Sequence, residues 1–118
     1  MSELLDLSMY VVMRGDLEAP AGKLLVQAGH AFLGAFKVAG PVRQVHYSYP
    51  TRKVSLRIPG LDELLQLRDR CEALGLPHHL VTDEGRTVFE TATTTCLGIG
   101  PLTKDEANKL NLRGLPKF

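Results

Sequence analysis

The feature that most constrains the fold of this chain is the apolar run MYVVM at residues 9–13. A continuous apolar run of this length is typical of a strand that is covered on both of its faces. The next segment, RGDLEAPAG, is expected to be a loop because Gly15, Pro20 and Gly22 interrupt regular structure. The run therefore predicts a strand inside a layered fold.

The following sequence supplies helices that can form such layers. A helix is expected over 23–39, where apolar residues recur at helical spacing. A second is expected over 61–75, with acidic residues in its first turn, arginines later and Gly75 as its C-terminal cap. Its buried stripe is expected to comprise Leu61, Leu64, Leu65, Cys71 and Leu74.

Further strands and a last helix complete the expected order. Residues 51–59, TRKVSLRIP, alternate between polar and apolar side chains, which is typical of an edge strand with one face in water. Strands are also expected over 78–82 and 93–100, and Thr103 and Glu106 form a capping box that begins a helix. The sequence thus predicts one α/β domain over 1–118, a single layer of four-stranded mixed β-sheet flanked by helices, in the order β-α-β-α-β-β-α.

The charges are distributed unevenly, although the net charge is only +1. No acidic residue occurs between residues 19 and 61, whereas the remaining chain carries a net −5. This asymmetry indicates a surface that meets a polyanion, and the alternative is a solvated basic face that is merely contiguous in sequence. The basic residues of this stretch are Lys23, Lys37, Arg43, Arg52, Lys53 and Arg57.

Several sequence features indicate where such a protein would act. The first residues, MSELLDLSMYVV, contain acidic residues where a secretory signal requires positive charge. Cys71 and Cys96 provide neither a disulfide framework nor a zinc-binding spacing. No apolar run is long enough to span a bilayer. We therefore expect a cytoplasmic protein with no metal and no cofactor.

The helix over 23–39 carries a polar stripe. Lys23, Gln27, His30 and Gly34 follow the spacing that places side chains on one helical face. The position of Lys23 is unusual, because the N-terminus of a helix is already positive. One hypothesis is that the stripe lines a cleft and that Lys23 and the free N–H groups of the first turn bind an anion. The alternative is a surface lysine and a core histidine.

A second set of polar residues follows the strand over 78–82. Asp83 stands at the expected strand end, where ligands and catalytic groups gather in open α/β sheets. Asp83 is a candidate general base and Arg86 a candidate phosphate clamp. The alternative is an aspartate that caps its own turn at Gly85.

Other site types are excluded by their missing motifs. The sequence contains no nucleophile elbow and no P-loop, and GIGP lacks the third glycine of a dinucleotide-binding loop. Adjacent His78 and His79 would point to opposite faces of a strand and so do not chelate one metal together. Cys96 is expected to be a buried thiol rather than a nucleophile.

Two separated motifs resemble those of the type-2 peptidyl-tRNA hydrolases. RGDLEAPAGKLLVQAGHAFLGAF, residues 14–36, is similar to the first signature of that family, and DEGRT, followed by Thr95 and LGIGP, is similar to the second. The resemblance extends from about Met9 to Pro101, and the interval from Asp83 to Thr95 also matches. The segment over 40–52 departs from the family, which usually has a longer link with a short helix there.

This resemblance implies a specific activity and site. Such enzymes cleave the ester that joins a peptide to the terminal ribose of tRNA, and they are usually homodimers that need no metal or cofactor. The resemblance implies that Lys23, Asp83 and Thr95 are the catalytic positions. It also implies that three further residues line the same cleft, namely Gln27, His30 and Thr87.

The residues agree with this chemistry in outline. Asp83 could orient or deprotonate a water, Lys23 could meet an oxyanion or an RNA phosphate, and Thr95 could position water. The acid-free stretch, including Lys53 and Arg57, is expected to hold the tRNA backbone. Tyr47 or Tyr49 could stack on a base, with strand packing as the alternative.

Two other functions remain open from the sequence. One is a non-catalytic RNA-binding or protein-interaction module on the same scaffold, although binding alone requires no carboxylate facing a polyanion. The other is a hydrolase of a different acyl ester or amide, against which the basic stretch argues.

Overall fold

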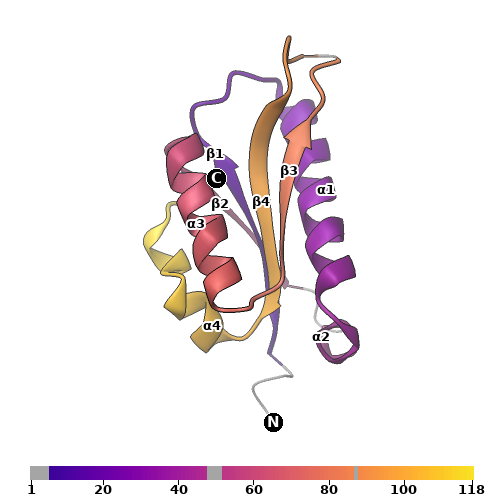
Figure 1. Ribbon diagram of the computed structural model, residues 1–118, viewed down its shortest axis with the longest axis vertical. Coiled ribbons are helices and arrows are strands. Elements are labelled where there is room, and N and C mark those ends of the chain that lie inside the picture. The colour runs from indigo at the N-terminus through magenta and orange to yellow at the C-terminus, as the bar shows by residue number, and fades with distance from the viewer. Residues whose placement is uncertain (1–5, 48–51, 87) are drawn as a thin grey trace.

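The structure is a computed structural model that describes residues 6–47, 52–86 and 88–118. A four-stranded mixed sheet lies between helices (Figure 1), as the sequence predicted. The chain order is β1 (Ser8–Arg14), α1 (Ala21–Val38), α2 (Pro41–His46), β2 (Arg52–Ile58), α3 (Leu61–Ala73), β3 (His78–Asp83), β4 (Thr93–Leu102), α4 (Lys104–Lys109) and the 3₁₀ helix η2 (Leu112–Gly114).

The strands lie in the spatial order β2-β1-β4-β3, so the MYVVM strand is central. β1 pairs in parallel with β2, and β4 pairs antiparallel with both β1 and β3. β2 lies at an edge, as its alternating sequence predicted, with Leu56 and Ile58 buried and Arg57 exposed. The two central strands are almost wholly buried because helices cover both of their faces.

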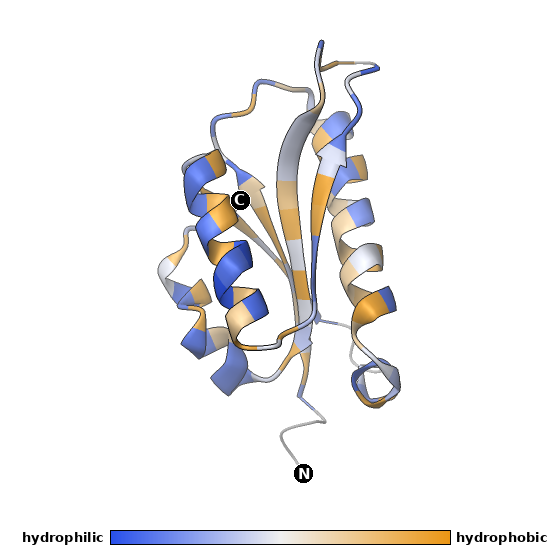
Figure 2. Ribbon diagram, viewed as in Figure 1, coloured by the Kyte–Doolittle hydropathy of each residue, from blue (hydrophilic) through white to orange (hydrophobic). Residues whose placement is uncertain are grey.

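Two layers of helices cover the sheet (Figure 1). α3 and α4 pack on one face over a core that includes Val12, Leu64 and Leu97, whereas α1 packs on the other, where Ala31 meets Val11 and Cys96. The middle of the sheet is hydrophobic and the visible surface of α3 is largely hydrophilic (Figure 2). No helix in the described ranges is both long enough and apolar enough to cross a bilayer.

The structure differs from the sequence prediction in α2, in η2, which was not predicted, in the buried stripe of α3, and in the start of α1, which lies at Ala21 rather than at residue 23. The short helix α2 was not predicted, although Pro41 at its first turn is a common helix start, because six residues give too little periodicity to detect. The buried stripe of α3 is formed by Leu64, Leu67 and Cys71, so the predictions for Leu61 and Leu74, which are exposed, were wrong. The predicted capping box of Thr103 and Glu106 is present.

The outer edge of β2 is paired with the last residues of the chain. The Arg57 N–H donates to the carbonyl of Pro116 at 2.9 Å, and the Phe118 N–H donates to the carbonyl of Ser55 at 3.1 Å. The Arg57 guanidinium also lies over the Phe118 ring, 4.8 Å from its centroid. Residues 116–118 therefore occupy the hydrogen-bonding positions that an edge strand otherwise presents to solvent.

Helix α1 approaches β4 most closely at Gly98. A Cβ added to Gly98 would lie 2.0 Å from the carbonyl oxygen of Ala31 and 2.5 Å from its carbonyl carbon. Both are backbone atoms, so no side-chain rotation could relieve the contact. Gly98 therefore sets the separation between α1 and the sheet.

A charged pair connects α2 to the start of α4. The Arg43 guanidinium contacts both carboxylate oxygens of Glu106, at 2.7 and 2.6 Å, and it also donates to the carbonyl of Pro101 at 2.8 Å. Hydrogen bonding to Arg43 is the main cause that lowers the pKa of Glu106 below its usual range. The pair fixes the position of the helix that the sequence did not predict.

Glu106→Gln is expected to lower the free energy of unfolding by about 2 kcal/mol at neutral pH, because a partly buried charge-assisted pair is lost. The lowered pKa means that the carboxylate stabilises the folded state above its unfolded pKa, and that this contribution disappears as pH falls through the folded pKa. The difference between wild type and variant should therefore shrink below about pH 4. Urea unfolding at several pH values measures it, with Asp105→Asn, an exposed acid of the same helical turn, as the control. An unchanged difference at pH 3 would contradict the assignment.

Candidate active site

The N-terminal turn of α1 lies beside the C-terminal end of β3 (Figure 1). Lys23 is in that turn and Asp83 is the last residue of β3. The Lys23 ammonium lies 2.7 Å from Oδ2 of Asp83, and both side chains are mostly buried, with exposed fractions of 16% and 12%. The anion that accompanies Lys23 in this structure is thus a carboxylate of the protein itself.

Gln27 connects this pair to Thr95. Its amide nitrogen donates to Oδ2 of Asp83 at 3.2 Å, and its amide oxygen accepts from the hydroxyl of Thr95 at 2.8 Å. Gln27 and Thr95 are 2% and 0% exposed, so this part of the network is closed to solvent. The buried polar groups satisfy one another, which fixes the orientation of the Gln27 amide toward Asp83.

Thr95 reaches Gln27 because of a β-bulge. Val81 pairs with Cys96 and Thr82 pairs with Thr94, so Thr95 is left between them without a cross-strand partner. Strict alternation would place Thr95 and Cys96 on opposite faces of β4, yet both side chains make hydrogen bonds to Gln27 of α1. The bulge thus turns the Thr95 hydroxyl toward the site, a common use of bulges beside active sites.

The carboxylate of Asp83 is held in its ionised form. Its hydrogen bond to Lys23 is the main cause that lowers its pKa, and the N–H of Gly85, which donates to Oδ1 at 2.8 Å, adds to the effect. A carboxylate with a lowered pKa is ionised at neutral pH and is a weak base. Asp83 therefore caps its own turn, as one interpretation of the sequence held, and its other carboxylate oxygen faces Lys23, while its role as a general base stays a prediction.

An open hollow of about 320 Å³ adjoins this network. Two predicted residues, His30 and Arg86, line it, and both are exposed, so the interpretation of His30 as a core histidine was wrong. Gly34, the last member of the predicted stripe, lies instead against the ring of His79. The residues that line the hollow are Lys23, Gln27, His30, Val81, Thr82, Asp83, Glu84 and Arg86.

The remaining predicted residues lie elsewhere. Thr87 and Tyr49 fall outside the described residues. Lys53 and Arg57 are on β2, at the opposite edge of the sheet from β3, and do not line the hollow. Tyr47 is buried against Phe36, which supports packing as its role.

Three residues near the site were missed from the sequence. Thr82 and Glu84 line the hollow on either side of Asp83, and the ammonium of Lys23 lies 5.9 Å from the centroid of the Phe89 ring. The adjacency of Thr82 and Glu84 to Asp83 was a usable signal. Nothing in the sequence indicated Phe89, because the loop after β3 brings it back toward α1.

The two cysteines are buried, as predicted for Cys96. Burial raises the pKa of the Cys96 thiol to about 11 and that of the Cys71 thiol to about 12. Both remain protonated at neutral pH, and a protonated thiol is a poor nucleophile.

The fold and the site together define an α/β protein in which a lysine–carboxylate pair lines a polar hollow, a combination suited to acid–base and oxyanion chemistry. Comparison with known proteins gives the family. Residues 7–113 match the family model described as peptidyl-tRNA hydrolase PTH2. The chain therefore belongs to the peptidyl-tRNA hydrolase PTH2 family, as its two motifs predicted.

Individual relatives match over most of their length. A peptidyl-tRNA hydrolase of Methanopyrus kandleri is 41% identical over 103 residues, covering 85% of this chain and 89% of the relative. Peptidyl-tRNA hydrolases of Methanothermobacter thermautotrophicus and Thermoplasma acidophilum are 34% and 31% identical, covering 85% and 87% of this chain and 90% and 89% of those proteins.

Proposed function

We propose that this chain hydrolyses the ester between a peptide, or an N-blocked amino acid, and the terminal ribose of tRNA. The observation that carries the proposal is the Lys23–Asp83 pair at 2.7 Å, joined through Gln27 to Thr95, in a member of the peptidyl-tRNA hydrolase family. Because peptidyl-tRNA arises during translation, we expect the chain to act in the cytoplasm.

The reaction requires a water and a stabiliser for negative charge. The water oxygen attacks the ester carbonyl carbon, a tetrahedral oxyanion forms, and the bond from carbon to the ribose oxygen breaks. The ribose oxygen leaves with one proton, the other proton is released to solvent, and the products are a peptide carboxylate and a tRNA with a free terminal hydroxyl. No atom changes its oxidation state in this reaction.

The geometry supports distinct roles for the four residues of the network. Asp83, with its lowered pKa, is suited to orienting the water more than to removing its proton completely. Lys23 is suited to the developing oxyanion or to a substrate phosphate. Thr95 is fully buried and donates to Gln27, so we assign it a positioning role that acts through the Gln27 amide.

We further propose that the exposed face of β2 contacts the tRNA backbone. Arg57, Met13, Cys96 and Val81 are successive register partners across the sheet, so Arg57 is level with the hollow and about 14 Å from it at the strand spacing of ~4.8 Å. Lys53 lies on the same face of β2 and is exposed. It is the register partner of Met9, four residues or about 13 Å further along the strand, so the two cations can bind separate phosphates while the terminal ribose occupies the hollow.

Charge reversal of both residues, Lys53→Glu with Arg57→Glu, is expected to weaken tRNA binding about tenfold or more and to reduce the salt slope by about 2, because two phosphate contacts are lost. Binding titrations at several salt concentrations measure both quantities. Arg68→Glu with Lys109→Glu changes the net charge equally at sites outside the hollow and β2, and it should have a small effect. Equal salt slopes in the two double variants would remove this face from the RNA-binding surface.

The activity itself is tested by release of N-acetylaminoacyl groups from tRNA by the purified protein, with a small acyl ester as the comparison substrate. Turnover of the tRNA substrate supports the proposal. Turnover of the small ester alone would indicate a hydrolase of other acyl esters, and tRNA binding without any turnover would indicate a non-catalytic RNA-binding module.

We propose that the chain forms a homodimer through the outer face of α1. Leu25, Val26 and Leu33 are 72%, 55% and 61% exposed around the small residue Gly29. On the other side of α1, its buried residues pack on the sheet, so this helix is apolar on two faces. A contiguous exposed apolar surface of this kind is typical of an interaction site, and the family relationship favours a second copy of the chain as the partner.

Val26→Glu with Leu33→Glu is expected to convert the protein to a monomer, because it places two charges in the proposed interface. Sedimentation equilibrium measures the mass, and Leu61→Glu with Leu74→Glu, at two exposed leucines of α3 and its C-terminal end, is the matched control. A wild-type protein that remains monomeric at high concentration would refute the dimer.

A further inference from the structure

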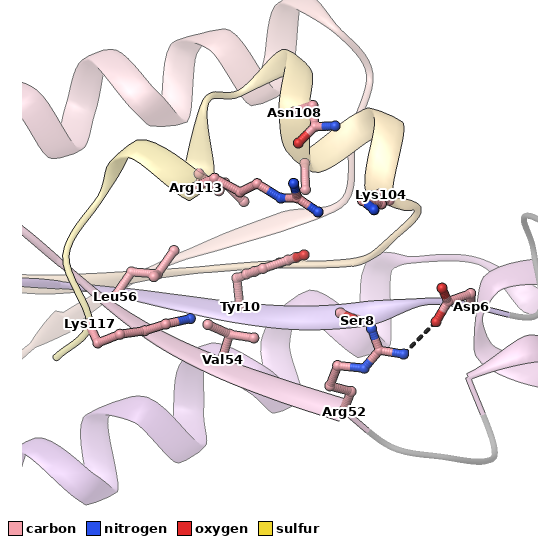
Figure 3. Close-up of a pocket in the computed structure, with 12 residues that line it drawn as sticks. Asp6, Ser8, Tyr10, Arg52, Val54, Leu56, Lys104, Asn108, Arg113 and Lys117 are labelled. Atoms are coloured by element: carbon pink, nitrogen blue, oxygen red, sulfur yellow. Dashed lines mark hydrogen bonds and ion pairs between the residues drawn. The ribbon is translucent and has the colours of Figure 1, made fainter.

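A second cavity lies on the opposite side of the sheet from α1. It has a volume of about 260 Å³ and opens between the sheet and the C-terminal segment that includes α4 and η2 (Figure 3). We call it the β2–α4 recess. Its lining residues are Asp6, Ser8, Tyr10, Arg52, Val54, Leu56, Lys104, Ala107, Asn108, Leu112, Arg113 and Lys117.

The floor of the β2–α4 recess is formed by alternate residues of the two parallel strands. Tyr10 of β1 is the register partner of Val54 of β2, and Ser8 is the partner of Arg52. Tyr10 and Val54 pack against the core beneath α3 and α4, which places them on the face opposite α1. The recess is therefore separate from both the hollow and the face of β2 that carries Lys53 and Arg57.

Four cations from four separate segments surround this floor. Arg52 comes from β2, Lys104 from α4, Arg113 from η2 and Lys117 from the C-terminal segment. Figure 3 shows Arg113 and Lys117 extending toward Tyr10 from two sides. Such a convergence of positive charge in a small concave space creates a strongly positive local potential.

The lining contains one acidic residue, and it compensates only one of these cations. Asp6 pairs with Arg52, as the dashed line in Figure 3 marks. Within the described residues, no ion pair is formed by Lys104, Arg113 or Lys117. Three positive charges therefore face the recess without a carboxylate partner, while Ser8 and Asn108 add uncharged hydrogen-bonding groups.

We propose that the β2–α4 recess binds a multiply charged, phosphate-containing ligand of about the size of a nucleotide. Arginine supplies a planar fork of donors that matches phosphate oxygens, and lysine supplies a compact charge, so Arg113 with Lys104 and Lys117 can neutralise two or three negative charges. The volume of the recess is near the lower limit of small-molecule pockets, and this size suits a diphosphate together with part of the sugar attached to it. The phosphate comes either from a free nucleotide or from an RNA.

Calorimetric titration of the whole protein with inorganic pyrophosphate, ATP and AMP tests the proposal. We expect saturable binding of pyrophosphate and ATP, weaker binding of AMP, and loss of affinity as salt concentration rises. Arg113→Glu with Lys117→Glu should weaken binding at least tenfold. The milder pair Arg113→Gln with Lys117→Gln should weaken it in the same direction, and thermal melts establish that each variant is folded.

The control and the second arm identify the source of the phosphate. Arg68→Glu with Lys109→Glu, which changes net charge equally, should leave binding within about twofold because neither residue lines the recess and salt screens charges at a distance. The second arm measures the affinity of the protein for deacylated tRNA. If the free anions do not bind, and if the affinity for tRNA falls at least tenfold in the recess variants but not in the control, the recess binds RNA phosphate. No binding of any of these probes, or equal losses in recess and control variants, would overturn the proposal. These readouts are binding constants, so they stand or fall independently of hydrolase activity.

Discussion

Lys23→Ala is expected to lower kcat about 100-fold or more if Lys23 stabilises the oxyanion, as the loss of other oxyanion-stabilising groups does. The substitution removes a cation from the positive end of a helix, which is favourable, but it also leaves the mostly buried Asp83 carboxylate without its partner, so we expect a modest fall in melting temperature with the fold retained. Steady-state kinetics on N-acetylaminoacyl-tRNA, together with thermal melts, measure both effects. A raised KM with an unchanged kcat would show instead that Lys23 binds a substrate phosphate.

Asp83→Asn serves as the matched variant in the same experiment. It preserves the shape of the side chain and an oxygen that can accept from Gly85, but it removes the charge that faces Lys23. We expect kcat to fall while tRNA affinity stays level or rises, because a negative charge near the RNA is lost. A folded Asp83→Asn protein with near-wild-type turnover would rule out a role for the carboxylate in the reaction, and a large fall in melting temperature would favour a structural role.

Gly98→Ala is expected to destabilise the fold by about 3 kcal/mol or more, because overpacking against rigid neighbours cannot be relieved by a side-chain movement. The added methyl group would meet the Ala31 carbonyl oxygen at 2.0 Å, so α1 would have to move away from β4. That movement would also separate Gln27 from Thr95, which are only 2.8 Å apart. Urea denaturation and tRNA hydrolysis should therefore be affected together.

Gly22→Ala provides the control for this substitution. Gly22 is in the first turn of α1, and a Cβ added there would have no neighbour within 4 Å. Alanine favours helix over glycine by about 1 kcal/mol, so stability should stay level or rise slightly. A Gly98→Ala protein as stable as Gly22→Ala would show that the α1–β4 contact is not fixed at Gly98.

The order and type of the main elements could be predicted because each depends on local sequence. Apolar runs, alternation and the capping box at Thr103 all act over a few residues, and they correctly gave the four strands, the long helices and the edge position of β2. The short helix α2 was missed because six residues give too little periodicity and because its position depends on the contact of Arg43 with Glu106, 63 residues away. Local periodicity contains no information about such a contact.

The residues of the candidate site could be predicted better than the way in which the fold arranges them. Lys23, Gln27 and Asp83 were identified from their places at element ends and from the family motifs, and the structure brings them together. The burial of Thr95 and its orientation toward Gln27 were not predictable, because they depend on a bulge that shifts the register between β3 and β4. The β2–α4 recess was missed because its cations come from four segments that only the fold brings together.

The pairing of residues 116–118 with β2 has a consequence for self-association. An unpaired edge strand with buried Leu56 and Ile58 on one face is a template on which a strand of another molecule can add, and this is how many β-proteins aggregate. Here the hydrogen-bonding groups of Ser55 and Arg57 are already used by Phe118 and Pro116. The chain thereby blocks growth of its sheet from this side with a segment of its own backbone.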